Sequence, residues 1–195
     1  MDIKEAIYGR RSVRKYDGRP IKEEDIREII EAGLMAPNAS NYQPWYFVAV
    51  SNQEKLQEVK DIMARAAEVL TPSLTARFEK YPQVVAETKQ FISMMGNAPC
   101  CILAFLLKDD ADYVRKETEF VQSVAAALEN MLLTAYSKGI SSCWLTGPIE
   151  AEMDVILREK FAPDKGKMLA MITLGYSDQK PKAPRRREGR YEIIS

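Results

Sequence analysis

The sequence predicts an α+β fold, and three observations support it. The 195 residues are 46% hydrophobic and 29% charged, which is typical of a globular chain long enough to bury a sizeable core. Amphipathic segments interleave with about four short apolar ones that have strand composition. The first strand is expected only after two helices, without regular βαβ alternation, which disfavours a doubly wound parallel sheet. Because no linker or repeat divides the chain, residues 1–195 are expected to form a single domain.

The N-terminal part of the chain is expected to form two helices and a strand. Residues 2–9 (DIKEAIYG) have a short helical pattern that ends at a glycine, and a basic loop follows at residues 10–19. Residues 22–35 place apolar side chains at helical spacing, and Pro37 ends that helix. Residues 45–50 (WYFVAV) are aromatic and β-branched, which predicts a strand.

The next segment is expected to contain two helices joined by a loop. Residues 53–69 carry an apolar face at helical spacing. Residues 71–82 contain Pro72 and Pro82, so they are expected to form a loop with a helical turn. A further helix is expected over residues 83–95.

The second half of the chain is expected to supply three strands and two helices. Residues 100–107 (CCILAFLL) form an apolar run that predicts a buried strand. A long helix is expected over residues 111–137, where a glycine soon follows as a cap. Residues 140–145 are expected to form a short strand, residues 150–160 an amphipathic helix, and residues 168–174 (MLAMITL) a last strand.

The composition excludes several kinds of chemistry. The 28 Lys and Arg residues equal the 28 Asp and Glu residues, and there is no His. Without an imidazole, a Ser-His-Asp or Cys-His relay and a His-ligated zinc are excluded. Cys100, Cys101 and Cys143 form no CxxC motif and a poor disulfide framework, so we expect reduced thiols and a cytoplasmic location. We expect neither a secretory leader nor a membrane span, because no suitable apolar run is present.

The charge is unevenly distributed, and both ends are basic. Residues 180–195 carry six basic and two acidic side chains, while residues 28–179 are acidic on balance. Residues 10–15 (RRSVRK) combine guanidinium groups with a hydroxyl, and these donors suit a phosphate. A solvated basic loop is the alternative. The acidic body disfavours a nucleic-acid-binding role.

Two further segments have ligand-binding chemistry. Residues 36–45 (APNASNYQPW) join a helix to a strand and offer amide groups that can read the edge of a flat heterocycle. Residues 145–148 (LTGP) end a strand with a glycine whose backbone a ligand can approach closely. Ordinary turn chemistry is the alternative for both segments. Neither a GxGxxG fingerprint nor a P-loop is present.

Taken in order, these blocks resemble the nitroreductase family of FMN-dependent oxidoreductases, and the resemblance runs from Asp2 to the C-terminus. It implies an α+β homodimer with a mixed, mostly antiparallel sheet flanked by helices and two FMN sites at the subunit interface. It also implies a C-terminal segment that extends onto the partner subunit. The apolar residues 191–194 (YEII) would suit a strand added to the other subunit's sheet.

The resemblance assigns candidate cofactor-binding residues by position. The run that would bind the FMN phosphate and ribityl chain comprises Arg10, Arg11, Ser12 and Arg14. The loop that would lie against the flavin of the other subunit comprises Pro37, Asn38, Ala39 and Asn41, with Gln43 in the same signature. The segment whose backbone would approach the isoalloxazine comprises Leu145, Thr146 and Gly147. The basic tail that would also meet the phosphate is best matched by Arg185 and Arg187, with Arg186 as a close competitor. No catalytic side chain and no metal ligand are assigned.

The activity implied by the resemblance is electron transfer from NADH or NADPH, through FMN, to a nitroaromatic, quinone or similar small acceptor by a ping-pong mechanism. Because the flavin carries the redox chemistry, no protein acid or base is required, and the proton donor is water or a hydroxyl such as that of Tyr42. Residues 71–97 show no family signature, which leaves the acceptor open. The alternatives are an FMN-binding sensor or carrier without turnover, and a dehalogenating, enone-reducing or flavin-degrading branch of the family.

Overall fold

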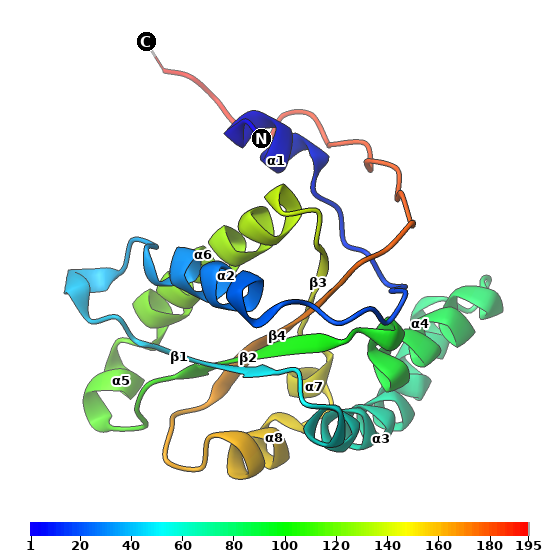
Figure 1. Ribbon diagram of the computed structural model, residues 1–195, viewed down its shortest axis with the longest axis horizontal. Coiled ribbons are helices and arrows are strands. Elements are labelled where there is room, and N and C mark those ends of the chain that lie inside the picture. The colour runs from blue at the N-terminus through cyan, green and yellow to red at the C-terminus, as the bar shows by residue number, and fades with distance from the viewer. Residues whose placement is uncertain (195) are drawn as a thin grey trace.

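The computed structural model describes residues 1–194 and has helices around one central sheet (Figure 1). The α-helices are α1 (Ile3–Gly9), α2 (Glu23–Leu34), α3 (Gln53–Arg77), α4 (Pro82–Met94), α5 (Ala111–Arg115), α6 (Glu117–Ser137), α7 (Gly147–Glu150) and α8 (Asp154–Phe161). The 3₁₀ turns are η1 (Ala39–Asn41) and η2 (Met95–Asn97). The strands are β1 (Trp45–Val50), β2 (Cys100–Leu106), β3 (Ser141–Leu145) and β4 (Met168–Gly175). The predicted α+β class is confirmed, and all four strands begin and end within one residue of their predicted bounds.

The sheet has the strand order β1-β2-β4-β3, and each neighbouring pair of strands is antiparallel. The two central strands are therefore β2 and β4, and the two edges are β1 and β3. A parallel bridge joins Ser12 to Ser142 on the outer side of β3. The sequence before α2 thus covers one edge of the sheet, while β1 stays at the other edge.

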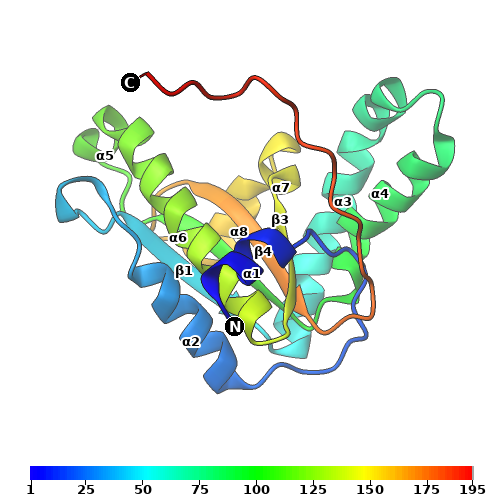
Figure 2. The same cartoon turned by 90° about the horizontal axis from the view of Figure 1, so that it is seen from above.

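The helices lie in two layers on opposite faces of the sheet. Figures 1 and 2 place α2 and α6 on one face and α3, α7 and α8 on the other. Strand β2 is buried along its whole length because both faces are covered, and its side chains alternate between two cores. Cys101, Leu103 and Phe105 contribute to the core under α3 and α8. Ile102 and Ala104 contribute to the core under α2 and α6.

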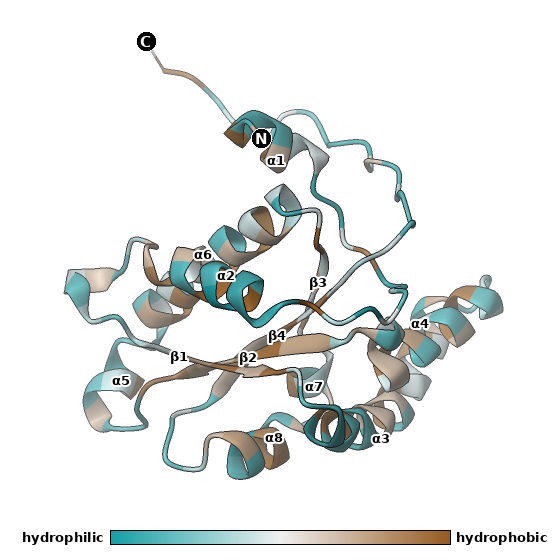
Figure 3. Ribbon diagram, viewed as in Figure 1, coloured by the Kyte–Doolittle hydropathy of each residue, from teal (hydrophilic) through white to brown (hydrophobic). Residues whose placement is uncertain are grey.

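The apolar residues concentrate along the strands and on the helix faces that turn toward them, as the hydropathy colouring in Figure 3 shows. This distribution explains why β2 is a continuous apolar run, whereas helices such as α2 have one polar side. Among residues 1–194, no helix is both long enough and apolar enough to cross a membrane.

The predicted loop over residues 71–82 is wrong. Helix α3 continues through Pro72 to Arg77, and α4 already begins at Pro82. A proline inside a helix removes one hydrogen bond and costs about 3 kcal/mol. Here Leu70 is buried and Leu74 packs against the same core. Burial of such side chains stabilises by about 1.5–3 kcal/mol each, which offsets the proline.

Two predicted helices are each divided in the structure. The expected helix over residues 111–137 breaks at Lys116, where ψ of 19° interrupts the helical backbone between α5 and α6. The ring of Tyr113 packs against Phe120 at 4.6 Å between centroids, and this contact is a tertiary constraint that helical periodicity does not reveal. The expected helix over residues 150–160 is replaced by α7 and α8, with Glu152 between them at a φ of 57°.

The chain after β4 forms no regular secondary structure as far as residue 194. It arcs past the N-terminal segment and then away from the body of the molecule (Figures 1 and 2). Tyr191, Ile193 and Ile194 are 86%, 81% and 91% exposed. The tail therefore presents apolar side chains that this protomer does not bury.

Candidate functional site

The basic segment that follows α1 is rigidly fastened at its apolar residues. The Val13 N–H donates a hydrogen bond of 2.9 Å to the carbonyl oxygen of Ser142 in β3. The Tyr16 N–H donates to the carbonyl oxygen of Gly96 at 2.8 Å, and the buried Tyr16 hydroxyl lies 2.8 Å from Thr173 Oγ1. Burial raises the pKa of Tyr16, so its hydroxyl stays protonated. These contacts hold in place the part of the segment that contains Arg14.

The arginines of this segment are only partly neutralised. Arg10 Nε lies 3.6 Å from a carboxylate oxygen of Glu129. Arg11 Nη1 donates to the carbonyl oxygen of Arg10 at 2.5 Å. Arg14 lies with its Cζ 5.8 Å from the ring centroid of Phe91. Neither Arg11 nor Arg14 has a carboxylate partner in residues 1–194, so both guanidinium groups retain free donors and uncompensated charge.

Cys143, in the edge strand β3, lies near side chains of the basic segment. Burial raises the pKa of the Cys143 thiol, while the charges of Arg14 and Arg10 and a hydrogen bond from Ser12 oppose that rise. Cys143 stands two residues before Leu145 in β3. The structure therefore brings the predicted residues 10–14 to the same strand whose end carries the predicted residues 145–147.

The end of β3 turns directly into α7. Leu145 is buried, whereas Thr146 is exposed and its Oγ1 donates to Glu150 Oε1 at 2.7 Å. Gly147 begins α7, and a Cβ added there would meet only Leu70 Cδ1, at 3.6 Å. The backbone at Gly147 is consequently not covered closely by other parts of the protomer.

The amide-rich loop between α2 and β1 is held in an unusual backbone conformation. Asn41 and Gln43 have φ values of 55° and 47°, which are rare for residues other than glycine. The Gln43 N–H donates to Asn38 Oδ1 at 2.9 Å, and Gln43 Nε2 donates to Asn41 Oδ1 at 3.2 Å. The Ala39 N–H donates to Ser123 Oγ in α6 at 3.2 Å. These bonds maintain a strained loop, a feature that often marks a functional segment.

Within one protomer, this loop is not brought to the basic segment. The loop is anchored at Ser123, whereas Arg10 is anchored at Glu129. Six residues of helix separate these anchors, or about 9 Å along the axis of α6. Figure 2 shows the loop at the α5 end of the molecule and the basic segment near β3. The predicted residues Pro37, Asn38, Ala39, Asn41 and Gln43 therefore form a second, separate group.

The tail arginines form a third group, which is exposed to solvent. Arg185 pairs with Glu188 at 3.5 Å, and both side chains are 90% exposed. Arg186 and Arg187 lie beside them and are also exposed. No ion pair or hydrogen bond joins Arg185, Arg186 or Arg187 to the basic segment in the described part of the chain.

The first residues of the tail are nevertheless fastened to the basic segment. The Asp17 N–H donates to the carbonyl oxygen of Tyr176 at 3.0 Å, and Ser177 Oγ donates to that of Lys15 at 2.5 Å. The Arg14 N–H donates to Gln179 Oε1 at 2.9 Å. The tail thus leaves the body beside the arginines near the N-terminus.

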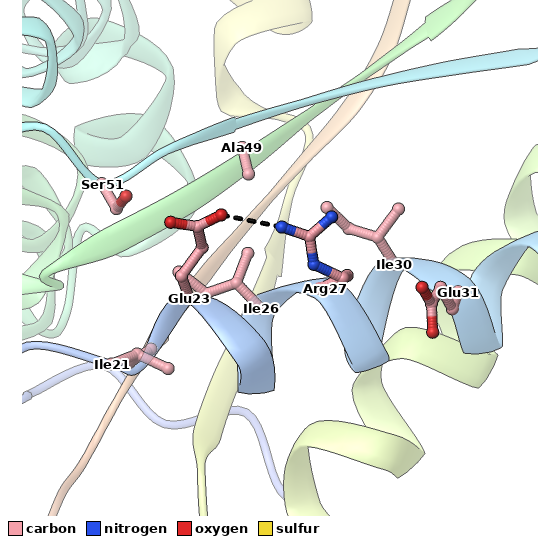
Figure 4. A pocket seen from close by; sticks show the side chains of 8 residues that line it. All are labelled: Ile21, Glu23, Ile26, Arg27, Ile30, Glu31, Ala49 and Ser51. Carbon is pink, nitrogen blue, oxygen red and sulfur yellow. Dashed lines mark hydrogen bonds and ion pairs between the residues drawn. The ribbon is translucent and has the colours of Figure 1, made fainter.

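A groove that the sequence analysis missed lies between α2 and the edge strand β1 (Figure 4). It encloses about 470 Å³. An ion pair of 2.8 Å between Arg27 and Glu23 stands at its side. Its lining residues are Ile21, Glu23, Ile26, Arg27, Ile30, Glu31, Ala49 and Ser51. The spacing of the isoleucines indicated only a helix. The groove exists because this helix lies beside the edge strand β1.

Comparison with known proteins decides the family. The sequence model of the Nitroreductase family matches residues 7–176. The chain belongs to the nitroreductase family. This family member is therefore an oxidoreductase, and its sheet with flanking helices is the nitroreductase-like fold.

The nitroreductase-family chain is similar to two archaeal proteins, each named "Putative NADH dehydrogenase/NAD(P)H nitroreductase". The one from Methanothermobacter thermautotrophicus is 30% identical over 93% of this chain and 80% of its own length. The one from Archaeoglobus fulgidus is 31% identical over 87% and 82%. A solved nitroreductase with bound FMN from Bacteroides fragilis covers 100% of both chains with a TM-score of 0.71 and 25% identity.

Proposed function

We propose that the protein binds FMN and transfers electrons from NADH or NADPH, through the flavin, to a nitroaromatic, quinone or similar small acceptor. The observation that carries this proposal is the pair of guanidinium groups of Arg11 and Arg14, which have no carboxylate partner within residues 1–194 and lie on a segment bonded to Ser142 of β3. The FMN bound in the Bacteroides fragilis relative supports the choice of cofactor.

The residues present fit the phosphate end of FMN. Arg10, Arg11 and Arg14 supply planar, permanently charged forks, and Ser12 adds a hydroxyl donor. The segment is already ordered by Val13, so little conformational entropy is lost when a phosphate binds. These residues would bind the phosphate and the adjoining ribityl chain.

The end of β3 fits the ring end of the same cofactor. Leu145 and Thr146 lead into Gly147, whose missing side chain lets a ligand approach the backbone. When bound, FMN supplies the redox chemistry by exchanging electrons first with a nicotinamide donor and then with an acceptor in a ping-pong cycle. The chain supplies binding and orientation, and because it has no His, we assign proton delivery to water.

We further propose that two copies of the chain form the active dimer. The loop containing Asn38 and Asn41 would lie against the FMN held by the partner subunit. This assignment is supported by the distance between that loop and the basic segment in a single protomer, where the two groups have separate anchors on α6.

The C-terminal tail is proposed to add a strand to the partner's sheet at β1. Edge β3 already carries the bridge from Ser12, whereas β1 has no strand on its outer side among residues 1–194. The groove beside β1 is lined by Ile26 and Ile30, which suit the exposed apolar side chains of residues 191–194. A tail that crosses the interface in this way would carry Arg185 and Arg187 toward a phosphate.

The proposed activity is tested on the purified protein. We expect a yellow protein with flavin absorbance, which releases FMN on denaturation and whose flavin absorbance bleaches when NADH or NADPH is added without oxygen. A screen of nitroaromatics and quinones would then identify acceptors that restore the absorbance. Protein that stays colourless after incubation with FMN would refute the proposal. Bound FMN that neither donor bleaches would instead identify a flavin sensor or carrier.

A further inference from the structure

Tyr42 and Lys116 form a contact to which the proposed function gives no role. Lys116 Nζ donates a hydrogen bond of 2.6 Å to the Tyr42 hydroxyl oxygen and lies 3.9 Å from the centroid of the Tyr42 ring. The same ring packs against Phe120 in a tilted arrangement, with 5.2 Å between the two ring centroids. The contact joins the strained loop to the break between α5 and α6. Tyr42 and Lys116 are 74 residues apart in the sequence.

The hydrogen-bonding capacity of this pair is incompletely used. An ammonium group has donors only, so the Tyr42 oxygen is the acceptor and its own O–H must point elsewhere. In the described part of the chain, no protein group accepts that O–H, and Lys116 Nζ makes no second hydrogen bond. Two neighbouring groups therefore present donors that lack a protein acceptor.

The charge of Lys116 is also uncompensated, although acidic residues flank it. Asp112 pairs with Arg115 at 2.7 Å, and Glu117 pairs with Lys167. Lys116 itself takes part in no ion pair within residues 1–194. It lies between the C-terminus of α5, where the helix dipole favours a cation, and the N-terminus of α6, where the dipole disfavours one. Because these two effects oppose each other, the helix dipoles give no net reason for a lysine here.

The loop holds the Tyr42 hydroxyl in a defined place. Asn41 and Gln43, on either side of Tyr42, both have positive φ values, and such backbone conformations cost about 1–3 kcal/mol each. The hydrogen bond from the Gln43 N–H to Asn38 Oδ1 helps to maintain them. The two donors are thus presented by an ordered framework.

We propose that Tyr42 and Lys116 form a subsite for an anionic oxygen group, such as a carboxylate, on an aromatic electron acceptor. This inference rests on the proposed function, in which the same loop lies against the partner's FMN. A carboxylate there would accept from the Tyr42 O–H and from a free N–H of Lys116, and both bonds would be charge-assisted. The subsite would select acidic aromatic acceptors over neutral ones of the same shape.

The experiment compares Lys116→Met and Tyr42→Phe with the wild type, each loaded with FMN. Arg115→Met is the matched control, because it removes a neighbouring cation that already has a partner. The probes are 4-nitrobenzoate and neutral nitrobenzene as acceptors, and benzoate as a non-reducible ligand whose dissociation constant is measured by isothermal titration calorimetry.

We expect Lys116→Met to raise KM for 4-nitrobenzoate and the dissociation constant of benzoate about tenfold or more, as for a lost charge-assisted hydrogen bond. Tyr42→Phe should raise the same two constants. Nitrobenzene turnover should stay close to the wild-type value in both variants, and Arg115→Met should leave all of these quantities close to wild type. Equal losses with both acceptors, unchanged benzoate affinity in Lys116→Met, or no benzoate binding to the wild type would each overturn the subsite. Failure to bind FMN would count against the proposed function instead, and is recognised by the missing flavin absorbance.

Discussion

A Cβ added to Gly96 would lie only 2.3 Å from the carbonyl oxygen of Arg14. Gly96 has a φ of 61° and its own carbonyl oxygen accepts from the Tyr16 N–H. A residue without a side chain after α4 is therefore needed for the basic segment to pass. The position of the candidate phosphate-binding arginines depends on this glycine in a distant turn.

Replacement of Gly96 by alanine is expected to destabilise the protein and displace the basic segment. The new methyl group meets backbone atoms, which cannot rotate away, at a φ that L-residues rarely adopt. We expect the free energy of unfolding in urea to fall by roughly 2–4 kcal/mol, the range of strained or overpacked sites. Gly139→Ala is the control, because Gly139 has a φ of 73° with nothing within 4 Å of the added Cβ. Equal losses in both variants would show that the close approach to Arg14 has no effect.

Removal of the uncompensated guanidinium groups is expected to weaken FMN binding selectively. Each charge-assisted contact contributes roughly 1.5–3 kcal/mol, so Arg11→Ala and Arg14→Ala should each raise the FMN dissociation constant about tenfold or more. Fluorescence titration of the FMN-free protein measures the effect. Riboflavin, which lacks the phosphate, should bind all variants alike. A parallel loss of riboflavin affinity would place these arginines away from the phosphate.

Charged substitutions in the tail are expected to dissociate the proposed dimer. Ile193 and Ile194 are almost fully exposed in one protomer, so Ile193→Asp/Ile194→Asp should leave its fold intact. If these side chains occupy the partner's groove, burial of two carboxylates there is strongly unfavourable. Analytical ultracentrifugation should then show a shift from dimer to monomer at micromolar concentration. Val155→Asp, at an exposed position on α8, serves as control, and an unchanged dimer in the tail variant would argue against strand addition.

The buried cysteines are expected to make stability fall at alkaline pH. Burial raises the pKa of the Cys100 thiol to about 12, and raises those of Cys101 and Cys143 as well. Above about pH 9 the unfolded chain loses thiol protons that the folded protein keeps, so increasing pH favours unfolding. Each such group contributes a slope of about 1.4 kcal/mol per pH unit. Urea denaturation under reducing conditions between pH 8 and 10.5 measures the slope, and Cys100→Ala should reduce it. A flat profile would contradict the assigned burial.

The strands could be predicted from local sequence because each is short and apolar and lies between polar turns. Residues 45–50 were predicted without error, and β2 ends one residue before its predicted bound. Pro72 was misleading, since local rules treat a proline as a helix end, whereas the packing of Leu74 on the core continues the helix. The break at Lys116 was likewise invisible, because both sides of it have helical composition.

The residues of the candidate site were predicted as four groups in sequence order, and their arrangement was not. Residues 10–14 lie along the strand that ends at Leu145 because Val13 pairs with Ser142 in this edge strand, a contact across 129 residues of chain. The groove beside β1 was missed because it is formed jointly by Ile30 and Ala49, on a helix and a strand. The pairing of Lys116 with Tyr42 gave no local signal either.

The sequence by itself determined the α+β class, the family resemblance, the absence of imidazole chemistry and the basic character of both ends of the chain. These properties depend on composition and on patterns within a few residues, so they can be predicted without knowledge of the tertiary contacts. Within residues 1–194, the tertiary structure alone decided that β1 is an open edge, that Arg11 and Arg14 lack carboxylate partners, and that the amide-rich loop lies apart from the arginines. Such properties arise from packing between distant segments, where burial and hydrogen bonding outweigh local preference.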